Sequence, residues 1–434
     1  MYQRIARLIV YKEISGADIL NDVAGCIYEY EQKKADKTQT VEKLYVQVHK
    51  LLDLATAYGF DENLWQAYLA YLLAMAETPF SLLCEKNGAA EGSVNVLVKN
   101  DFAIFRELFF YDFTELEKEL SINCFSVITN YHSIPKKVQY YNKSVGDKVK
   151  ELQHALAESE NVEDVFAAVT GFYKKYGVGQ FGLNKAFRLT GEGENFLIQP
   201  ITNTEIVRLD DIIGYELQKK TLVENTKAFV EGKKANNVLL YGDSGTGKST
   251  SIKAILNEFY DDGLRMIEIY KHQFHQLSAL ISKIKNRNYR FIIYMDDLSF
   301  EEFEIEYKYL KAVIEGGLEI RPENVLIYAT SNRRHLIRET WSDRSDMSKD
   351  EMHRSDTMQE KLSLVARFGV SINYSAPDKR EFEQIVKGIA AKYPELAGKE
   401  DMLLAQANIW ELRGGGLSGR SAQQFIHYIL GKEE

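Results

Sequence analysis

The fold of this chain is decided by the stretch Gly242-Asp243-Ser244-Gly245-Thr246-Gly247-Lys248-Ser249. It matches the pattern G-x-x-x-x-G-K-[ST] at every position. An apolar run at 237–241 comes before it and predicts a buried parallel strand. After it, apolar residues recur with a helical period between Ile252 and Phe259. In this order of strand, loop and helix, backbone N–H groups and a helix N-terminus point at phosphate oxygens.

These residue types predict a nucleotide-phosphate site. Lys248 is expected to reach the β and γ phosphates of ATP, and the Ser249 hydroxyl to ligate Mg²⁺. The expected nucleotide-binding residues of the loop are Gly242, Asp243, Ser244, Gly245, Thr246, Gly247, Lys248, Ser249 and Thr250. The alternative, a glycine turn before a surface helix, is weaker because the flanking strand and helix patterns are both present.

The composition excludes several classes of protein. With 45% hydrophobic and 27% charged residues, the 434-residue chain is expected to form two to three globular domains. Its three cysteines, Cys26, Cys84 and Cys124, are too few and too scattered for a disulfide framework, which favours a cytoplasmic location. The most apolar segment, 64–76, is shorter than the ~20 residues that cross a bilayer, so no membrane contact is expected. The net charge of −9 does not favour general attraction to nucleic acid.

The periodicity of apolar residues divides the chain into four parts. Residues 1–180 predict a mostly α-helical N-terminal domain whose role the sequence does not indicate. Residues 181–204 predict a hairpin or an extended connector. Residues 205–376 alternate strands with helices, which is typical of a parallel sheet, and residues 377–434 predict helices only. The strands expected in the sheet are 238–241, 266–269, 291–295, 325–330 and 370–374.

Polar side chains follow two of these expected strands. Asp296 and Asp297 come directly after residues 291–295, and Asn332 follows the next strand of the chain. Asp296 is expected to ligate Mg²⁺, and Asp297 to orient or deprotonate an attacking water, with Glu301 as the alternative base. Asn332 is expected to hold that water near the γ phosphate. Because ligands bind at the carboxyl edge of a parallel sheet, we expect these side chains to lie beside the phosphate loop.

Several segments together resemble a bacterial family of AAA+-type ATPases of unknown cellular function. The segments are Leu209–Gly214, the phosphate loop, Met295–Glu301, Thr330–Leu336, Glu360–Leu364, Arg367–Gly369 and Gly419–Ala422. The resemblance spans about residues 180–430. It implies an α/β fold with a five-stranded parallel-sheet AAA+ P-loop core, a C-terminal helical lid and a mostly α-helical N-terminal region, and it implies ATP and Mg²⁺ as ligands. The acid pair usual in such proteins is Asp-Glu, whereas this chain has Asp296-Asp297.

The same resemblance implies roles for further residues. Asn332 is similar to sensor 1, and Arg420 is similar to sensor 2 on the helical lid. Arg367 is similar to the arginine finger, which acts on ATP held by a neighbouring subunit. Ile213, in the first of the resembling segments, is implied in nucleotide binding.

The expected function is that of a homo-oligomeric, Mg²⁺-dependent ATPase that hydrolyses ATP at subunit interfaces to remodel or move an unknown protein client. A nucleic-acid loader or remodeller is an alternative, because the sequence has a basic cluster of Lys283, Lys285, Arg287 and Arg290. A solvated helix face accounts for that cluster better, so nucleic acid is not favoured. A nucleotide-gated switch with little hydrolysis and a small-molecule kinase are further alternatives, although a kinase needs no arginine finger.

Overall fold

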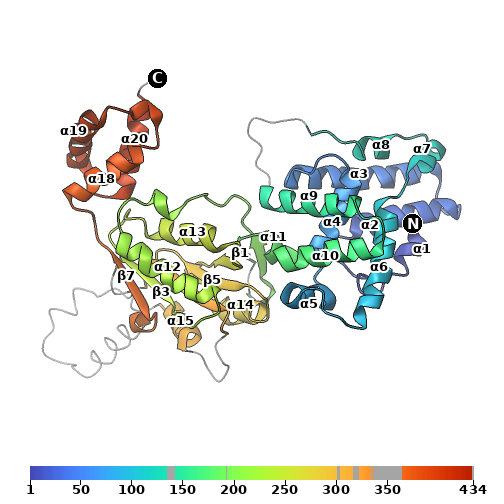
Figure 1. Ribbon diagram of the computed structural model, residues 1–434, viewed down its shortest axis with the longest axis horizontal. Coiled ribbons are helices and arrows are strands. Elements are labelled where there is room, and N and C mark those ends of the chain that lie inside the picture. Colours follow the sequence, from blue (N-terminus) through green and yellow to red (C-terminus); the bar gives the residue numbers. More distant parts are fainter. Residues whose placement is uncertain are drawn as a thin grey trace. The chain divides into compact units, whose positions relative to one another are not determined.

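The protein divides into two compact units, Met1–Asn184 and Lys185–Glu434, in its computed structural model (Figure 1). The structure describes residues 1–133, 142–191, 193–300, 304–315, 322–333, 336 and 364–432. Within this described part, no single helix has the length and apolar composition of a membrane span. Only Leu64–Met75 and Pro79–Asn87, taken together across a bend of 76°, pass that test.

The first unit is an assembly of helices in which α4 (Leu64–Met75) is the most buried. Helix α4 has apolar residues on all sides, so it has to be surrounded by other helices, and α3, α6, α9 and α10 contact it. The other helices of the unit are α1 Tyr2–Ile5, α2 Asp18–Glu31, α3 Lys37–Tyr58, α5 Pro79–Asn87, α6 Val94–Phe109, α7 Thr114–Leu120, α8 Cys124–Ile128, α9 Lys143–Ala157, α10 Val162–Tyr176 and α11 Gly179–Leu183.

Polar side chains cap the starts of α3 and α10. The Asp36 side chain precedes α3 and accepts a hydrogen bond from the Gln39 N–H at 2.9 Å. The same helix ends at Gly59, which has a φ of 69°. Asn161 and Asp164 form a capping box at the start of α10. The Asp36 and Asn161 side chains satisfy N–H groups that the first turn of a helix leaves without partners.

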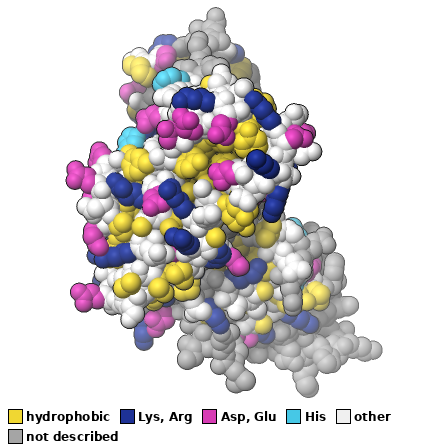
Figure 2. Space-filling view, turned by 90° about the vertical axis from the view of Figure 1, so that its right-hand side faces the viewer, with side chains coloured by type: hydrophobic (Ala, Val, Ile, Leu, Met, Phe, Trp, Pro, Cys, Tyr) yellow, Lys and Arg dark blue, Asp and Glu magenta, His cyan; other side chains and the backbone are white. Residues whose placement is uncertain are grey.

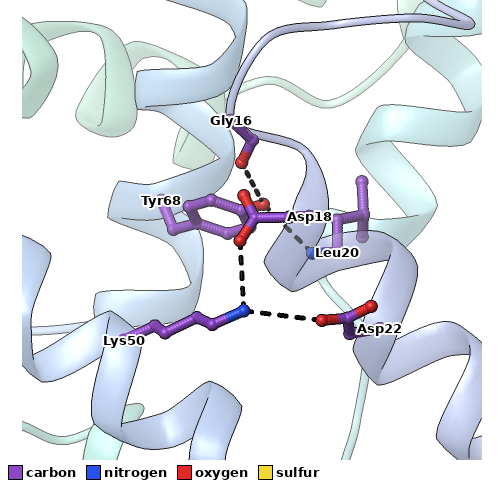
Figure 3. A network of polar contacts seen from close by, with 6 residues as sticks. All are labelled: Gly16, Asp18, Leu20, Asp22, Lys50 and Tyr68. Carbon is purple, nitrogen blue, oxygen red and sulfur yellow. Dashed lines mark hydrogen bonds and ion pairs between the residues drawn. The ribbon is translucent and has the colours of Figure 1, made fainter.

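A polar network joins α2 to α3 and α4 (Figure 3). The Tyr68 hydroxyl, from α4, donates to the Gly16 carbonyl oxygen at 2.9 Å and accepts from the Leu20 N–H at 3.0 Å. Lys50, from α3, forms ion pairs with two acids of α2, Asp18 and Asp22. Because the N-cap of α2 is Ala17, which has no polar side chain, Tyr68 takes over part of the capping.

Lysine and arginine side chains lie among aspartates and glutamates on the face of the first unit that Figure 2 shows. In this unit Lys99 forms an ion pair with Glu163, and Lys43 forms one with Glu29. Small apolar patches separate these charges. A mixed surface of this kind attracts polyanions less than a continuous basic face does.

The second unit is organised around a seven-stranded sheet with the order β2-β1-β4-β5-β6-β3-β7. Its strands are β1 Ala186–Thr190, β2 Leu197–Pro200, β3 Val238–Gly242, β4 Leu264–Glu268, β5 Arg290–Met295, β6 Val325–Ser331 and β7 Val370–Tyr374. Neighbouring strands run parallel, except that β1 and β2 form an antiparallel hairpin. From β3 the chain crosses to β4, returns through β5 and β6, and then passes to β7 on the other side of β3. The chain therefore leaves β3 toward one side of the sheet and later returns to its other side. Open α/β sheets bind ligands at such a reversal of strand order.

The prediction of five strands is wrong in its number. All five expected strands are present, but β1 and β2 extend the sheet beyond β4. Strand β1 pairs in parallel with β4, and Arg188 lies level with Glu268. This pairing buries Phe187 and Leu189 and covers the backbone edge of β4. The sequence indicates the hairpin, but it does not show that the hairpin joins the sheet, because the partner strand is distant in the chain.

Helices α12 (Glu216–Val230) and α13 (Lys248–Phe259) cover one face of the sheet (Figure 1). Leu222 and Ile252 from these helices share a core with alternate strand residues such as Val238, Leu240 and Ile292. Two more helices, α14 (Leu277–Ile284) and α15 (Glu306–Glu315), pack against each other. Strand β3 and helix α13 are thereby fixed on either side of the phosphate loop.

Three C-terminal helices form a small bundle with a hydrophobic core of its own, and this bundle is called the lid below. They are α18 Lys379–Ala390, α19 Glu400–Trp410 and α20 Gly419–Leu430. Ile213, from the segment before α12, packs against the lid core. A Cβ on Gly388 of α18 would lie 2.3 Å from Ile213 Cδ1, so this glycine leaves room for the isoleucine.

Candidate functional site

The phosphate loop, residues 242–249, connects the carboxyl end of β3 to α13. Gly242 has a φ of 132°, and a Cβ there would lie 2.2 Å from the carbonyl oxygen of Tyr374 on β7. Gly247 is the N-cap of α13 and has a φ of 95°. Both positions require glycine, because residues with a Cβ avoid these φ values and because a side chain at Gly242 would collide with β7.

The ammonium group of Lys248 lies inside the loop. Its Nζ donates to the carbonyl oxygens of Gly242 at 3.0 Å and Asp243 at 2.6 Å, and to Asn332 Oδ1 at 3.0 Å. Burial lowers the pKa of Lys248, while the negative charges of three nearby aspartates oppose that shift. The lysine is thus held in the loop by neutral acceptors that a phosphate group can replace.

Asp296 receives hydrogen bonds from two hydroxyl groups. Its Oδ1 accepts from Ser249 Oγ at 2.7 Å and from Thr330 Oγ1 at 2.5 Å. Burial alone would raise the pKa of Asp296, but the hydrogen bonds from Thr330 and Ser249 lower it, and the pKa lies below its usual value. The carboxylate is therefore negatively charged at neutral pH.

The pair of Ser249 and Asp296 suits a magnesium ion. Both offer oxygen ligands, which Mg²⁺ prefers, and Mg²⁺ usually takes only one or two ligands from the protein and the rest from water and phosphate. In the described residues, no group of three or more His, Cys, Asp or Glu gathers that could form a complete protein cage. The donor set present thus fits Mg²⁺ bound together with a nucleotide.

Asp297 lies between Asp296 and the Asn332 amide. Its backbone N–H donates to Thr330 Oγ1 at 2.9 Å, and its Oδ1 accepts from Asn332 Nδ2 at 2.8 Å. Its φ is 48°, in the left-handed region that few residues other than glycine adopt. Asn332 contacts Asp297 with its amide nitrogen and Lys248 with its amide oxygen, so it bridges the loop and the acid. The alternative base, Glu301, lies outside the described residues.

The lid reaches the loop through Arg420 and its neighbours. The Arg420 N–H donates to the Gly245 carbonyl oxygen at 3.1 Å. The Arg420 side chain is exposed and lines the same cavity as the phosphate loop. A second link joins Lys392 to Asp211 at 2.6 Å, and the lysine lowers the pKa of Asp211. The lid therefore contacts both the loop and the segment before α12.

These groups surround a cavity of about 720 Å³. This volume lies within the range of ~300–1,000 Å³ that is typical of sites for small ligands. The residues expected from the sequence that line it are 244–250, Ile213, Asp296, Asp297, Asn332 and Arg420. Gly242 and Asp243 do not line the cavity, because they connect the loop to β3 and β7.

Sequence reasoning missed the lid side of this cavity. Ile385 and Ile389 of α18 line it, and Tyr393 lies just beyond that helix. The spacing of Ile385 and Ile389 is the one expected for any helix that buries an apolar face, so it does not single them out. Thr330 also lines the cavity, and the sequence assigns it no role of its own at the site.

Arg367 is not brought to this cavity. It lies three residues before β7, where Val370 pairs with Val238 at the start of β3. The phosphate loop follows the other end of β3, so Arg367 lies at the amino edge of the sheet and the loop at the carboxyl edge. Arg367 forms an ion pair with Glu315, at the end of α15.

Three cations of the basic cluster are engaged within the fold. Lys283 Nζ donates to the Phe196 carbonyl oxygen at 3.0 Å and lies 4.0 Å from the centre of the Phe196 ring. Arg290 donates to the Glu323 carbonyl oxygen at 2.9 Å. The Arg287 guanidinium lies 5.9 Å from the centre of the Tyr289 ring. These contacts give the cluster a structural role.

The comparison with known proteins finds one family over this unit. The model of a family described as a protein of unknown function (DUF815) matches residues 183–433, more than half of the chain. Among curated proteins, none matches the chain. The matched residues contain the whole sheet, the phosphate loop and the lid, and they exclude almost all of the first unit.

Proposed function

The chain belongs to DUF815, a family of proteins of unknown function, and we propose that its second unit is an ATPase that binds ATP with Mg²⁺ and hydrolyses it to ADP and phosphate. The observation that carries the proposal is the convergence of Lys248, Ser249 and Asp296 on one cavity at the carboxyl edge of a parallel sheet. A lysine, a hydroxyl and an acid in these positions are the parts with which P-loop enzymes bind nucleotide phosphates.

The phosphate loop supplies the binding site for the phosphate chain. The N–H groups at the start of α13 have no partners within the helix and carry partial positive charge, so they attract phosphate oxygens. Lys248 exchanges its contacts with the Gly242 and Asp243 carbonyl oxygens for contacts with the β and γ phosphates. The Asn332 amide oxygen continues to accept a hydrogen bond from Lys248 Nζ, and this bond restricts the orientation of the ammonium group.

Ser249 and Asp296 would hold the metal ion. Their oxygens already contact each other at 2.7 Å, so both point at the same place. Bound Mg²⁺ supplies positive charge that neutralises the phosphate oxygens. The lowered pKa of Asp296 keeps this ligand deprotonated over the neutral pH range.

Among the described residues at the cavity, Asp297 is the acid that we propose to act on the attacking water. In the proposed step, the water oxygen forms a bond to the γ phosphorus, and the bond from that phosphorus to the β–γ bridging oxygen breaks. The proton of the water passes to Asp297, and the bridging oxygen stays with ADP. Asn332 holds Asp297 Oδ1 and thereby orients the carboxylate. Glu301 is the alternative proton acceptor.

The lid would report on the state of the nucleotide. Arg420 lines the cavity and contacts the loop through its own N–H, so the loss of the γ phosphate changes its surroundings. Ile213, Ile385 and Ile389 give the lid side of the cavity an apolar surface that suits a base. We propose, in agreement with the AAA+ resemblance, that lid motion acts on a protein client.

Arg367 is proposed to complete the site of a second copy of the chain. Its place at the amino edge of the sheet makes it remote from the loop of its own chain. A homo-oligomer in which Arg367 faces the cavity of the next subunit gives this residue a role in hydrolysis. Guanidinium supplied in this way stabilises charge that develops in the transition state.

A nucleotide-gated switch with little hydrolysis is the second candidate. The observation that favours it is the shorter acid at position 297, held by Asn332 at 2.8 Å. If that contact persists with ATP bound, Asp297 accepts a proton from water poorly. Such a switch would bind ATP as tightly as the ATPase and release phosphate slowly.

Calorimetric titration with ATP and Mg²⁺ tests the binding part of this proposal. Lys248→Ala should lose tight ATP binding, because it removes the point charge aimed at the β and γ phosphates. Lys227→Ala serves as the control, since this lysine is exposed on α12 and pairs only weakly with Glu231. Equal affinity of Lys248→Ala and the parent chain would contradict the proposal.

A further inference from the structure

Thr330 lies between the two acids of the site. It is the second-last residue of β6, a central strand, and its side chain is buried. Met295 at the end of β5 pairs with Ala329, so the next residues of the two strands, Asp296 and Thr330, also lie side by side. This register places a hydroxyl group against the point where the chain leaves β5.

One oxygen atom of Thr330 contacts both acids. Its Oγ1 donates to Asp296 Oδ1 at 2.5 Å and accepts from the Asp297 N–H at 2.9 Å. A hydroxyl group has one proton to donate and lone pairs to accept with, so both contacts are made at the same time. The Thr330 carbonyl oxygen also accepts from the Leu298 N–H at 2.7 Å.

We propose that Thr330 is a positioning residue whose hydroxyl sets the directions of Asp296 and Asp297 together. The bond to Asp296 Oδ1 fixes that carboxylate beside Ser249. The bond from the Asp297 N–H helps to hold a residue whose φ of 48° is unfavourable without such support. Because the two bonds share one oxygen, a displacement of one acid disturbs the other.

The hydroxyl, rather than the shape of threonine, carries this role. Valine has nearly the same shape and suits a strand equally well, but it offers neither a donor nor an acceptor. Thr330→Val therefore leaves the strand in place, removes one hydrogen bond from Asp296 and deprives the Asp297 N–H of its acceptor. Thr330→Ser keeps the hydroxyl. This inference rests on the proposed function for its link to Mg²⁺, although the contacts themselves do not need a nucleotide.

Amide hydrogen exchange at Asp297 in the nucleotide-free chain is the first measurement. Thr330→Val should exchange this amide at least ~5-fold faster than the parent, which is the effect of one net hydrogen bond. Thr330→Ser should match the parent. Thr226→Val is the matched control, because its buried hydroxyl contacts the Leu222 carbonyl oxygen and Tyr328 and is not bonded to either acid.

The dependence of ATP affinity on Mg²⁺, measured by calorimetry, is the second measurement. Mg²⁺ is expected to increase the ATP affinity of the parent, and in Thr330→Val this increase should be ~10–100-fold smaller. Losing a hydrogen-bond partner of a metal ligand typically has an effect of this size. ATP affinity without Mg²⁺ should not change. Thr330→Ser should restore most of the gain.

The inference is overturned if Thr330→Val exchanges the Asp297 amide like the parent, or if Thr226→Val shows the same changes. Should Thr330→Val unfold, Thr330→Ala removes the same hydroxyl and takes its place. A parent chain that binds no ATP would contradict the proposed function alone, because the exchange measurement still decides on Thr330. If the parent binds ATP with Mg²⁺, and Thr330→Val matches the parent in amide exchange and in the effect of Mg²⁺ on ATP affinity, only the positioning role is contradicted.

Discussion

Asp297 combines an unfavourable backbone conformation with a fixed side chain. Its φ of 48° is held by the bond to Thr330, and its carboxylate is held by Asn332. Strained residues of this kind persist where neighbouring contacts over-determine them, and they gather at functional sites. The conformation thus agrees with a role for Asp297 in the chemistry.

The first residue-scale prediction concerns this acid. Asp297→Asn should bind ATP like the parent chain but release phosphate ~10²–10⁴-fold more slowly, the usual contribution of a general base. The amide keeps the size of the side chain and can still bond to Asn332, while it cannot take a proton from water. Calorimetry measures the affinity, and a steady-state phosphate assay measures the rate.

Glu301→Gln is the comparison for this experiment. A larger loss of phosphate release in Glu301→Gln than in Asp297→Asn would move the role of the base to Glu301. Parent-like rates in both variants would contradict catalysis by either acid and would favour the nucleotide-gated switch.

At the scale of elements, the connection from β7 to the lid is tied to the phosphate loop. Asp243 Oδ2 accepts from the Ala376 N–H at 2.7 Å, and the Asp243 N–H donates to the Tyr374 carbonyl oxygen at 3.0 Å. The Tyr215 hydroxyl donates to the Ser375 carbonyl oxygen at 2.9 Å. These hydrogen bonds connect the loop and the segment before α12 to the residues between β7 and α18.

Asp243→Ala should loosen this connection. A hydrogen bond to a charged group contributes ~1.5–3 kcal/mol, so the Ala376 amide should exchange at least ~10-fold faster in the nucleotide-free chain. Asp243→Asn keeps an acceptor oxygen and is the matched control. Identical exchange at Ala376 in the alanine and asparagine variants would show that Asp243 does not restrain the lid.

Much of the second unit could be predicted from the sequence, because its signals are local. The G-x-x-x-x-G-K-[ST] pattern and the apolar runs identify β3, β5 and β6 and the polar residues after them. Contacts that depend on distant pairing could not be predicted in this way. Three such contacts join segments far apart in the chain. They are the pairing of β1 with β4, the packing of Ile213 against Gly388, and the two hydrogen bonds of the Thr330 hydroxyl.

At the scale of the whole molecule, Arg367 does not reach the cavity of its own chain. Arg367 is held by Glu315 at the amino edge of the sheet, while the cavity opens at the carboxyl edge. The first unit adds a helical body whose core is separate from that of the sheet. The account therefore predicts that the working molecule contains more than one copy of the chain.

An oligomer of this kind should show turnover that rises faster than linearly with protein concentration. Arg367→Ala should keep the ATP affinity of the parent and lose ~10³–10⁵-fold in turnover, the contribution of an arginine supplied by a second subunit. Arg380→Ala is the control, since this arginine is exposed on α18. Parent-like turnover in Arg367→Ala would show that Arg367 has only its structural ion pair.

Mixing two inactive variants tests the central claim, hydrolysis of ATP in this cavity with help from a second copy, most directly. Arg367→Ala subunits keep an intact nucleotide site, and Lys248→Ala subunits keep an intact Arg367. The account predicts that co-assembled mixtures regain Mg²⁺-dependent phosphate release that neither variant shows alone. No recovery in mixtures proven to co-assemble, or concentration-independent turnover by a monomeric parent chain, would contradict it.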